Sequence, residues 1–152
     1  MKQPKYQLKA EKDLTIFEFV SEGTKGRIPK LIVFTETNLK DFYNLAFGDK
    51  DEETGQLNDR IVSNNNDTEK VLATVVSAIY AFTDKYPEAW VYATGSTTAR
   101  TRLYRMGINK YLNEVLNDFH IYGELGDEWL PFENETNFNG YVVKRKTINF
   151  AS

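Results

Sequence analysis

The stretch that decides the fold is VLATVVSAIYAF, residues 71–82, which is followed after a proline by AWVYAT, residues 89–94. Apolar residues recur at helical spacing through 71–82 without a single charged residue. This pattern predicts a helix that is mostly buried. Asn66 and Asp67 precede it as cap residues, and Glu69 stands three positions after Asn66, which predicts a capping box at the start of the helix.

The run 89–94 is short and apolar, and it ends at a glycine. Such a run is typical of an interior strand, and with helical sequence on both sides it is expected to pair parallel to a neighbour. Residues 96–119 keep an approximate helical register and predict a second helix. Gly107 lies inside this helix, where glycine costs about 1 kcal/mol relative to alanine. We therefore expect a kink or a break at Gly107.

The first half of the chain has the composition of strands. Residues 14–21 and 27–37 are rich in β-branched and aromatic side chains, and the linker EGTKG between them contains two glycines. This arrangement predicts an antiparallel hairpin. Residues 42–49 and 59–64 flank an acidic loop and predict a second hairpin.

The last part of the chain returns to strands at residues 120–125, 128–133 and 140–148, which predicts an antiparallel meander. The expected order is four strands, a helix, a strand, a helix and two or three strands. This order indicates an α+β fold, with a mainly antiparallel mixed sheet of about seven strands covered by two helices. We expect residues 1–152 to form a single domain.

Composition narrows the class of protein. The chain has 152 residues, of which 41% are hydrophobic and 14% aromatic, enough for a core without disulfides or metals. The absence of cysteine excludes disulfides and thiolate zinc sites. A polar N-terminal stretch and the lack of long apolar runs indicate a soluble, cytoplasmic protein with no membrane span. A net charge of −3 argues against a protein that coats nucleic acid in general. We also expect no bound cofactor.

The stretch richest in chemistry is YATGSTTARTRLYRMGI, residues 92–108. A strand that leads through a glycine into a helix presents free backbone N–H groups and the positive end of the helix dipole, which favour an anion. Two arginines three positions apart share a helix face and are able to clamp a phosphate. The candidate anion-binding residues are Ser96, Thr97, Arg100, Arg102 and Arg105.

A structural interpretation of the same stretch remains open. A serine or threonine at the start of the helix stabilises it as an N-cap, and the arginines also fit a solvated face. The spacing matches neither a P-loop nor a dinucleotide fingerprint. SNNND, residues 63–67, presents the same choice between an anion-binding nest and a turn with a cap.

Four further features of the sequence contain charged or metal-ligating side chains. The acidic loop at residues 49–53 fails the calcium-binding EF-hand pattern, and it fits a solvated hairpin tip. His120 is the only histidine, which excludes a His-rich metal site. The carboxylates of residues 124–128 fit a turn. The basic run at residues 144–146 fits either a charged sheet edge or a ligand site.

Several stretches resemble an uncharacterised family of bacterial domains of unknown function, about this long and frequent in Bacteroidota-type genomes. The matching stretches are NLAFGD, SNNNDTEKVLATVVSAIYAFTDKYPEAWVYATGSTTARTRLYRMGINKYL, IYGELGDEWLPFE and YVVKRK. The resemblance covers most of the chain. It implies a bacterial single-domain protein and carries no activity, substrate or catalytic residue.

A weaker resemblance concerns the GCN5-related N-acetyltransferases. The order of the expected elements is similar to theirs, and so is ARTRLYRMGI, residues 99–108. The resemblance implies that Tyr104 is able to protonate the thiolate of coenzyme A. The chain departs from that family where SNNNDTEK replaces its pyrophosphate loop, and where Gly107 follows the tyrosine one residue early.

Three functions follow from these observations. The first is a binding or interaction protein, rather than an enzyme, that holds a phosphate-bearing ligand or nucleic acid at the start of the second helix. The second is a degenerate GCN5-like acyltransferase that uses Tyr104. The third is a partner-binding component of a toxin–antitoxin or defence locus, in which exposed aromatic side chains form the interface.

Overall fold

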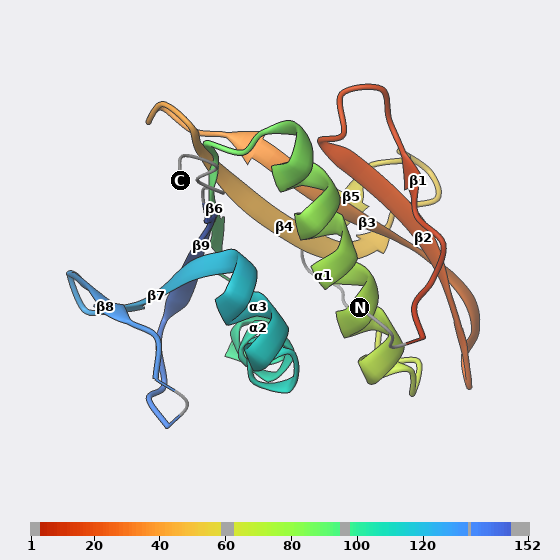
Figure 1. Cartoon of the computed structure of the whole chain (residues 1–152). Coiled ribbons are helices and arrows are strands. Elements are labelled where there is room, and N and C mark those ends of the chain that lie inside the picture. The colour runs from red at the N-terminus through yellow and green to blue at the C-terminus, as the bar shows by residue number, and fades with distance from the viewer. Residues whose placement is uncertain (1–3, 59–62, 95–97, 134, 147–152) are drawn as a thin grey trace.

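The computed structural model describes residues 4–58, 63–94, 98–133 and 135–146, with only the backbone of residues 98–100, 103 and 112. The first five strands come before any helix (Figure 1). They are β1 (Lys9–Ala10), β2 (Ile16–Gly23), β3 (Gly26–Glu36), β4 (Phe42–Lys50) and β5 (Leu57–Asn58).

Helices and strands alternate in the second half before three closing strands. The elements are α1 (Thr68–Lys85), β6 (Trp90–Ala93), α2 (Thr98–Lys110), α3 (Leu112–Asp118), β7 (Phe119–Leu125), β8 (Glu128–Pro131) and β9 (Gly140–Arg145). The predicted α+β class is confirmed, with an open, mostly antiparallel sheet of nine strands among the described residues.

The sheet has the strand order β1-β2-β3-β4-β6-β9-β7-β8, and β5 pairs with β4. The hairpin of β2 and β3 is confirmed. β6 lies parallel to β4, as its helical flanks predicted, because α1 crosses over the sheet between them. This crossover determines where α1 and α2 begin relative to the strands of the sheet.

One strand prediction lies mostly outside the described residues, and another needs correction. The strand that returns from β4 occupies Leu57–Asn58, before the predicted 59–64, of which 59–62 lie outside the described residues. The closing strands do not form a meander, because β9 inserts between β6 and β7. Tyr141, Val142 and Val143 are all buried, and a strand buried on both faces is stable only in the interior of a sheet.

The start of α1 differs from the predicted capping box. The residue before the helix is Asp67, and its side chain makes no capping hydrogen bond. Its carboxylate instead accepts hydrogen bonds from Tyr6 Oη at 2.6 Å and from Ser21 Oγ at 2.5 Å. The contacts to distant parts of the chain therefore replaced the local cap.

The predicted second helix is broken at a different place. α2 runs through Gly107, and the break follows at Tyr111, between α2 and α3. A Cβ added at Gly107 would lie 3.1 Å from Cδ2 of Leu72 on α1. The glycine is therefore used for close packing of two helices, and its helix-weakening effect is outweighed.

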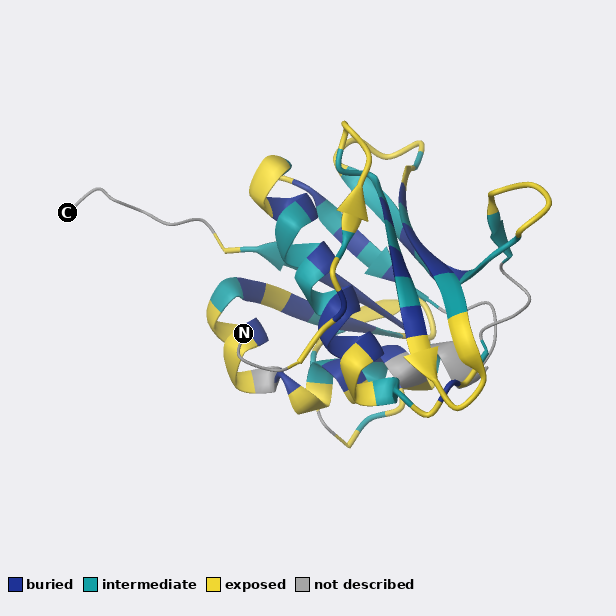
Figure 2. Ribbon diagram, turned by 90° about the vertical axis from the view of Figure 1, so that its right-hand side faces the viewer, coloured by how far each residue is buried: buried dark blue, intermediate teal, exposed yellow. Residues whose placement is uncertain are grey.

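The core lies between the helices and one face of the sheet (Figure 2). Aromatic rings dominate it, as the composition indicated: Phe34 and Phe82 stack with their ring centroids 4.1 Å apart, and Tyr43 packs edge-on against Phe82. Among the described residues, no helix has both the length and the apolar character needed to cross a membrane.

Burial raises the pKa of six of the nine tyrosines above the ordinary value of 10.0. They are Tyr6, Tyr43, Tyr80, Tyr92, Tyr111 and Tyr141. The folded protein keeps these protons at a pH where the unfolded chain loses them. The stability they contribute is therefore fully present below about pH 10 and is lost as the pH rises further.

We therefore expect the free energy of unfolding to fall steeply above about pH 10. Just below that pH, the tyrosines do not change the free energy of unfolding. Urea unfolding at several pH values, followed together with the absorbance of tyrosinate, measures both effects. Ionisation of most tyrosines near their ordinary pKa in the folded protein would contradict the expectation.

Candidate functional site

A cavity of about 60 Å³ lies between the sheet and the three helices. Val91 on β6 and Val143 on β9 contribute to its floor, and Leu72 and Val75 on α1 to one wall. Tyr104 on α2 and Tyr141 on β9 also line it, and both are buried. The surrounding residues are almost all aliphatic or aromatic, so the cavity suits an apolar group.

Tyr141 is the unusual member of this lining. It is 1% exposed, and its hydroxyl has no hydrogen-bond partner among the described residues. Burial raises the pKa of Tyr141, while the nearby charge of Arg105 lowers it. A buried hydroxyl without a partner costs about 1–3 kcal/mol. Tyr141 is thus a residue beside the cavity with a buried hydroxyl that lacks a partner among the described residues.

All three predicted arginines lie on α2, and the structure describes the side chains of two of them. Arg102 is exposed, and Arg105 is half-buried and donates a hydrogen bond from Nη1 to Oδ1 of Asn137. They stand three positions apart and so share one helix face. Arg105 acts electrostatically on Tyr141, and thus connects this face with the cavity.

The structure describes no side chain of the other three candidate residues. Ser96 and Thr97 lie outside the described residues, and so does the side chain of Arg100. α2 begins at Thr98, directly after β6 and this short segment. The prediction of an anion site made from Ser96, Thr97 and Arg100 therefore stays a prediction.

The start of α1 was the second candidate for an anion. Because β4 and β6 are parallel neighbours, α1 and α2 both begin beyond the carboxyl ends of strands, where ligands gather in such sheets. At α1, however, the carboxylate of Asp67 and the acidic Glu69 already lie in the positive field of the helix dipole. The start of α2 contains no acidic residue, which favours α2 over α1 as an anion site.

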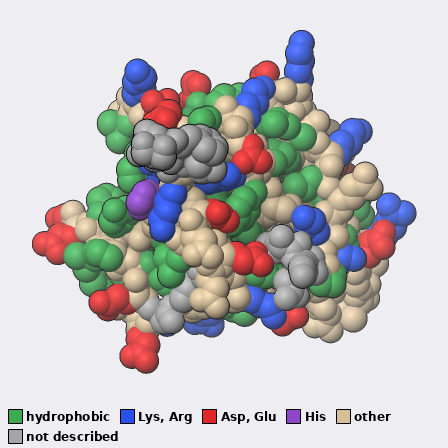
Figure 3. Space-filling view, viewed as in Figure 1, with side chains coloured by type: hydrophobic (Ala, Val, Ile, Leu, Met, Phe, Trp, Pro, Cys, Tyr) green, Lys and Arg blue, Asp and Glu red, His purple; other side chains and the backbone are tan. Residues whose placement is uncertain are grey.

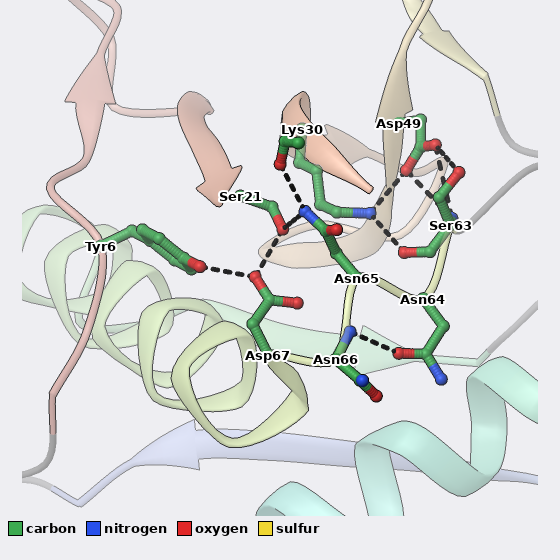
Figure 4. A network of polar contacts seen from close by, with 10 residues as sticks. Tyr6, Ser21, Lys30, Asp49, Ser63, Asn64, Asn65, Asn66 and Asp67 are labelled. Carbon is green, nitrogen blue, oxygen red and sulfur yellow. Dashed lines mark hydrogen bonds and ion pairs between the residues drawn. The ribbon is translucent and has the colours of Figure 1, made fainter. Parts of the chain in front are cut away.

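The asparagine run is part of a polar network that fastens the loop before α1 to the sheet (Figure 4). Asn65 is buried, and its Nδ2 donates to Ser21 Oγ at 3.1 Å and to the carbonyl of Gly26 at 2.9 Å. Its Oδ1 accepts from the backbone N–H of Lys25 at 2.6 Å. These contacts favour the interpretation of SNNND as an anchored turn.

The same network contains a buried ion pair that sequence reasoning missed. Lys30 is 1% exposed, and its Nζ donates to Oδ1 of Asp49 at 2.6 Å and to the carbonyl of Ser63 at 3.0 Å. Ser63 donates through its hydroxyl to Asp49. The alternation of side chains along β3 could have indicated that Lys30 is buried, because it lies on the same face of the strand as Ile32 and Phe34.

The remaining sequence features have structural positions. Asp51 closes the turn after β4 by accepting the backbone N–H groups of Glu53 and Thr54, and no group of three or more metal-ligating side chains occurs in the described part of the chain. His120 is exposed on β7. The charged-edge interpretation of residues 144–146 is wrong, because β9 lies inside the sheet.

Acidic and basic side chains are interspersed on the face shown in Figure 3. Ion pairs in the described part of the chain include Lys110 with Glu69 at 2.7 Å and Arg145 with Asp84 at 2.8 Å. A protein that coats nucleic acid needs clustered cations. On the face that Figure 3 shows, the cations are instead mixed with acidic side chains.

A search of the curated proteins and a search of the solved structures found no match. One family model matches residues 2–146, which is nearly the whole chain, and it describes a family of unknown function. The chain therefore belongs to this family, DUF6934.

Proposed function

We propose that this protein binds a small phosphate-bearing ligand that also carries a short apolar group. The apolar group enters the cavity, and the phosphate lies against the arginines of α2. The observation that carries the proposal is Tyr141, a residue of the cavity lining whose buried hydroxyl has no hydrogen-bond partner among the described residues and whose pKa is raised by burial and lowered by the charge of Arg105. A ligand that accepts a hydrogen bond there supplies the missing partner.

The volume of the cavity limits the apolar group. A dry cavity of about 150 Å³ accepts a benzene molecule. The cavity here is about 60 Å³, which is room for only a few non-hydrogen atoms. An acetyl or propionyl group matches this size, and its carbonyl oxygen is able to accept a hydrogen bond from Tyr141.

Charge supports the position of the phosphate. Arginine binds phosphate oxygens in a bidentate manner, and a helix start adds backbone donors and the positive end of the dipole. Arg102 and Arg105 offer two guanidinium groups on one face of α2.

Acetyl-CoA is the first probe, because it combines phosphates with a small acyl group. We expect it to raise the melting temperature of the protein, since a ligand at 100 times its Kd adds about 2.7 kcal/mol. Arg102→Ala combined with Arg105→Ala is expected to weaken binding about tenfold or more and to reduce its salt dependence. The matched control, Arg27→Ala with Lys12→Ala, removes two exposed charges elsewhere and is expected to change little.

A second pair of variants tests the cavity. Val75→Ile together with Val91→Ile adds two methyl groups to its lining. We expect the folded protein to remain stable while acetyl-CoA loses its advantage over coenzyme A, which has no acyl group. If the cavity were only a packing defect, these variants would leave the affinities for both compounds unchanged.

Acyl transfer is a second candidate function, favoured by the position of Tyr104. Its side chain is buried and lines the cavity that we assign to the acyl group. In the acetyltransferases that the sequence resembles, a tyrosine in this part of the chain protonates the departing thiolate. An assay of thiol release from acetyl-CoA with a panel of amines tests this role, and Tyr104→Phe is expected to abolish the release without abolishing binding. Binding without any thiol release would leave the ligand-binding proposal and reject the enzyme.

A further inference from the structure

The sheet face opposite the helices carries a groove of about 340 Å³. We call it the outer groove, and its lining residues come from five different strands. They are Phe42 on β4, Trp90 on β6, Tyr122 on β7, Trp129 on β8 and Val142 on β9. None of them takes part in the cavity under the helices.

The sheet register builds the groove from these residues. Val142 lies between Tyr92 on one neighbouring strand and Tyr122 on the other, and at 4% exposure it forms the floor. The ring centroids of Trp90 and Tyr122 lie 6.1 Å apart across the sheet. Trp129 packs edge-on against Tyr92 at 5.6 Å and is 42% exposed. The aromatic rings thus form the walls of the outer groove, Val142 forms its floor, and the groove is open to solvent.

The charges around the outer groove are not balanced. Nζ of Lys144 lies 5.3 Å from the centre of the Trp90 ring and 3.7 Å from a carboxylate oxygen of Glu88, so this cation has its partners. Glu124 stands opposite Trp129 in the register, and its carboxylate accepts a hydrogen bond from Tyr92 Oη at 2.8 Å. Within the described part of the chain, Glu124 has no ion-pair partner.

We propose that the outer groove binds a small organic ammonium cation. Aromatic faces attract such cations, and the attraction is stronger where water is excluded. The carboxylate of Glu124 at the rim complements the positive charge, and the volume of the groove falls in the range of small-molecule sites. Lys144 over Trp90 shows the same preference within the chain itself.

Nucleic acid is a poorer match for this surface. Stacking of bases on aromatic rings is accompanied by a groove of positive charge that follows the phosphates. The only cation that contacts a ring of the outer groove among the described residues is Lys144, and it is already paired with Glu88. A carboxylate at the rim would repel a phosphate.

Choline is a suitable probe, and the protein provides its own reporter, because both of its tryptophans line the outer groove. Choline is expected to change the tryptophan fluorescence with a saturating curve in the millimolar range. Its neutral carbon analogue, 3,3-dimethylbutanol, is expected to bind about tenfold more weakly or worse, a difference of 1.4 kcal/mol or more. Choline and acetyl-CoA are expected to bind without competing with one another.

Variants separate the site from general quenching. Glu124→Gln is expected to weaken choline binding at least several-fold, and Trp129→Ala to remove most of it, while Leu39→Ala, at an exposed apolar residue elsewhere, changes nothing. Thermal unfolding of each variant verifies that it is folded. Equal binding of the neutral analogue, full binding by Glu124→Gln, or the absence of a saturating signal with choline would overturn the proposal.

Discussion

Asp49→Ala is expected to lower the free energy of unfolding by about 3–5 kcal/mol, the range measured when one partner of a buried ion pair is removed. The ammonium group of Lys30 is almost completely buried, and Asp49 is its only charged partner among the described residues. The variant leaves this charge in the interior with one carbonyl acceptor, that of Ser63. It also removes the acceptor for the hydroxyl of Ser63, which helps to fix the loop before α1.

Urea unfolding of Asp49→Ala measures the loss. The control is Asp49→Ala combined with Lys30→Met, which removes the buried charge and keeps the aliphatic length of the side chain. We expect the double variant to recover a large part of the stability that the single variant loses. A loss below about 1 kcal/mol for Asp49→Ala would show that water reaches Lys30 and that the pair is not buried in solution.

Phe82→Ala is expected to destabilise the protein by a similar amount, about 3–5 kcal/mol. Phe82 is fully buried on α1. Its ring stacks on Phe34 of β3 and contacts Tyr43 of β4 and Tyr86. Truncation therefore leaves a cavity between α1 and the sheet, and the loss includes both the transfer free energy and the cavity.

Urea unfolding measured for Phe82→Ala gives this loss directly. Leu116→Ala is the matched control, because Leu116 is an apolar residue in a helix but is 42% exposed. It is expected to change the free energy of unfolding by about 0.5 kcal/mol at most. Equal effects of the two substitutions would contradict the packing of α1 on the sheet.

The sequence was most informative where structure depends on nearby residues. The uncharged run of α1, the parallel strand β6 and the β2–β3 hairpin followed from periodicity and turn residues. The insertion of β9 between β6 and β7 did not. It depends on contacts between segments far apart in the chain, which local patterns do not encode.

The sites were predicted less completely than the fold. The arginines of α2 were predicted as a site because they follow a strand and a glycine, and this stays a prediction. Tyr141 was missed, because its significance arises from the cavity and from Arg105, which lie far away in the sequence. The outer groove was missed for the same reason, since its five residues come from five strands.

The capping box was wrong for an instructive reason. Asn66 and Glu69 have the local pattern of a cap, but Asp67 forms hydrogen bonds with Tyr6 and Ser21 instead. Tertiary contacts thus determined the start of α1 against the local signal. The same carboxylate lies at the positive end of α1, and for this reason we propose the anion site at α2 and not at α1.

The most direct test of the proposed function is the affinity of the wild-type protein for acetyl-CoA compared with coenzyme A, measured by titration calorimetry at low and at moderate salt. We predict that both compounds bind, that acetyl-CoA binds more tightly because its acyl group fills the cavity, and that added salt weakens both by screening the arginines. Failure of both compounds to bind, or equal affinities that do not respond to salt, would contradict the assignment of the cavity and the arginines of α2 to a phosphate-bearing acyl ligand.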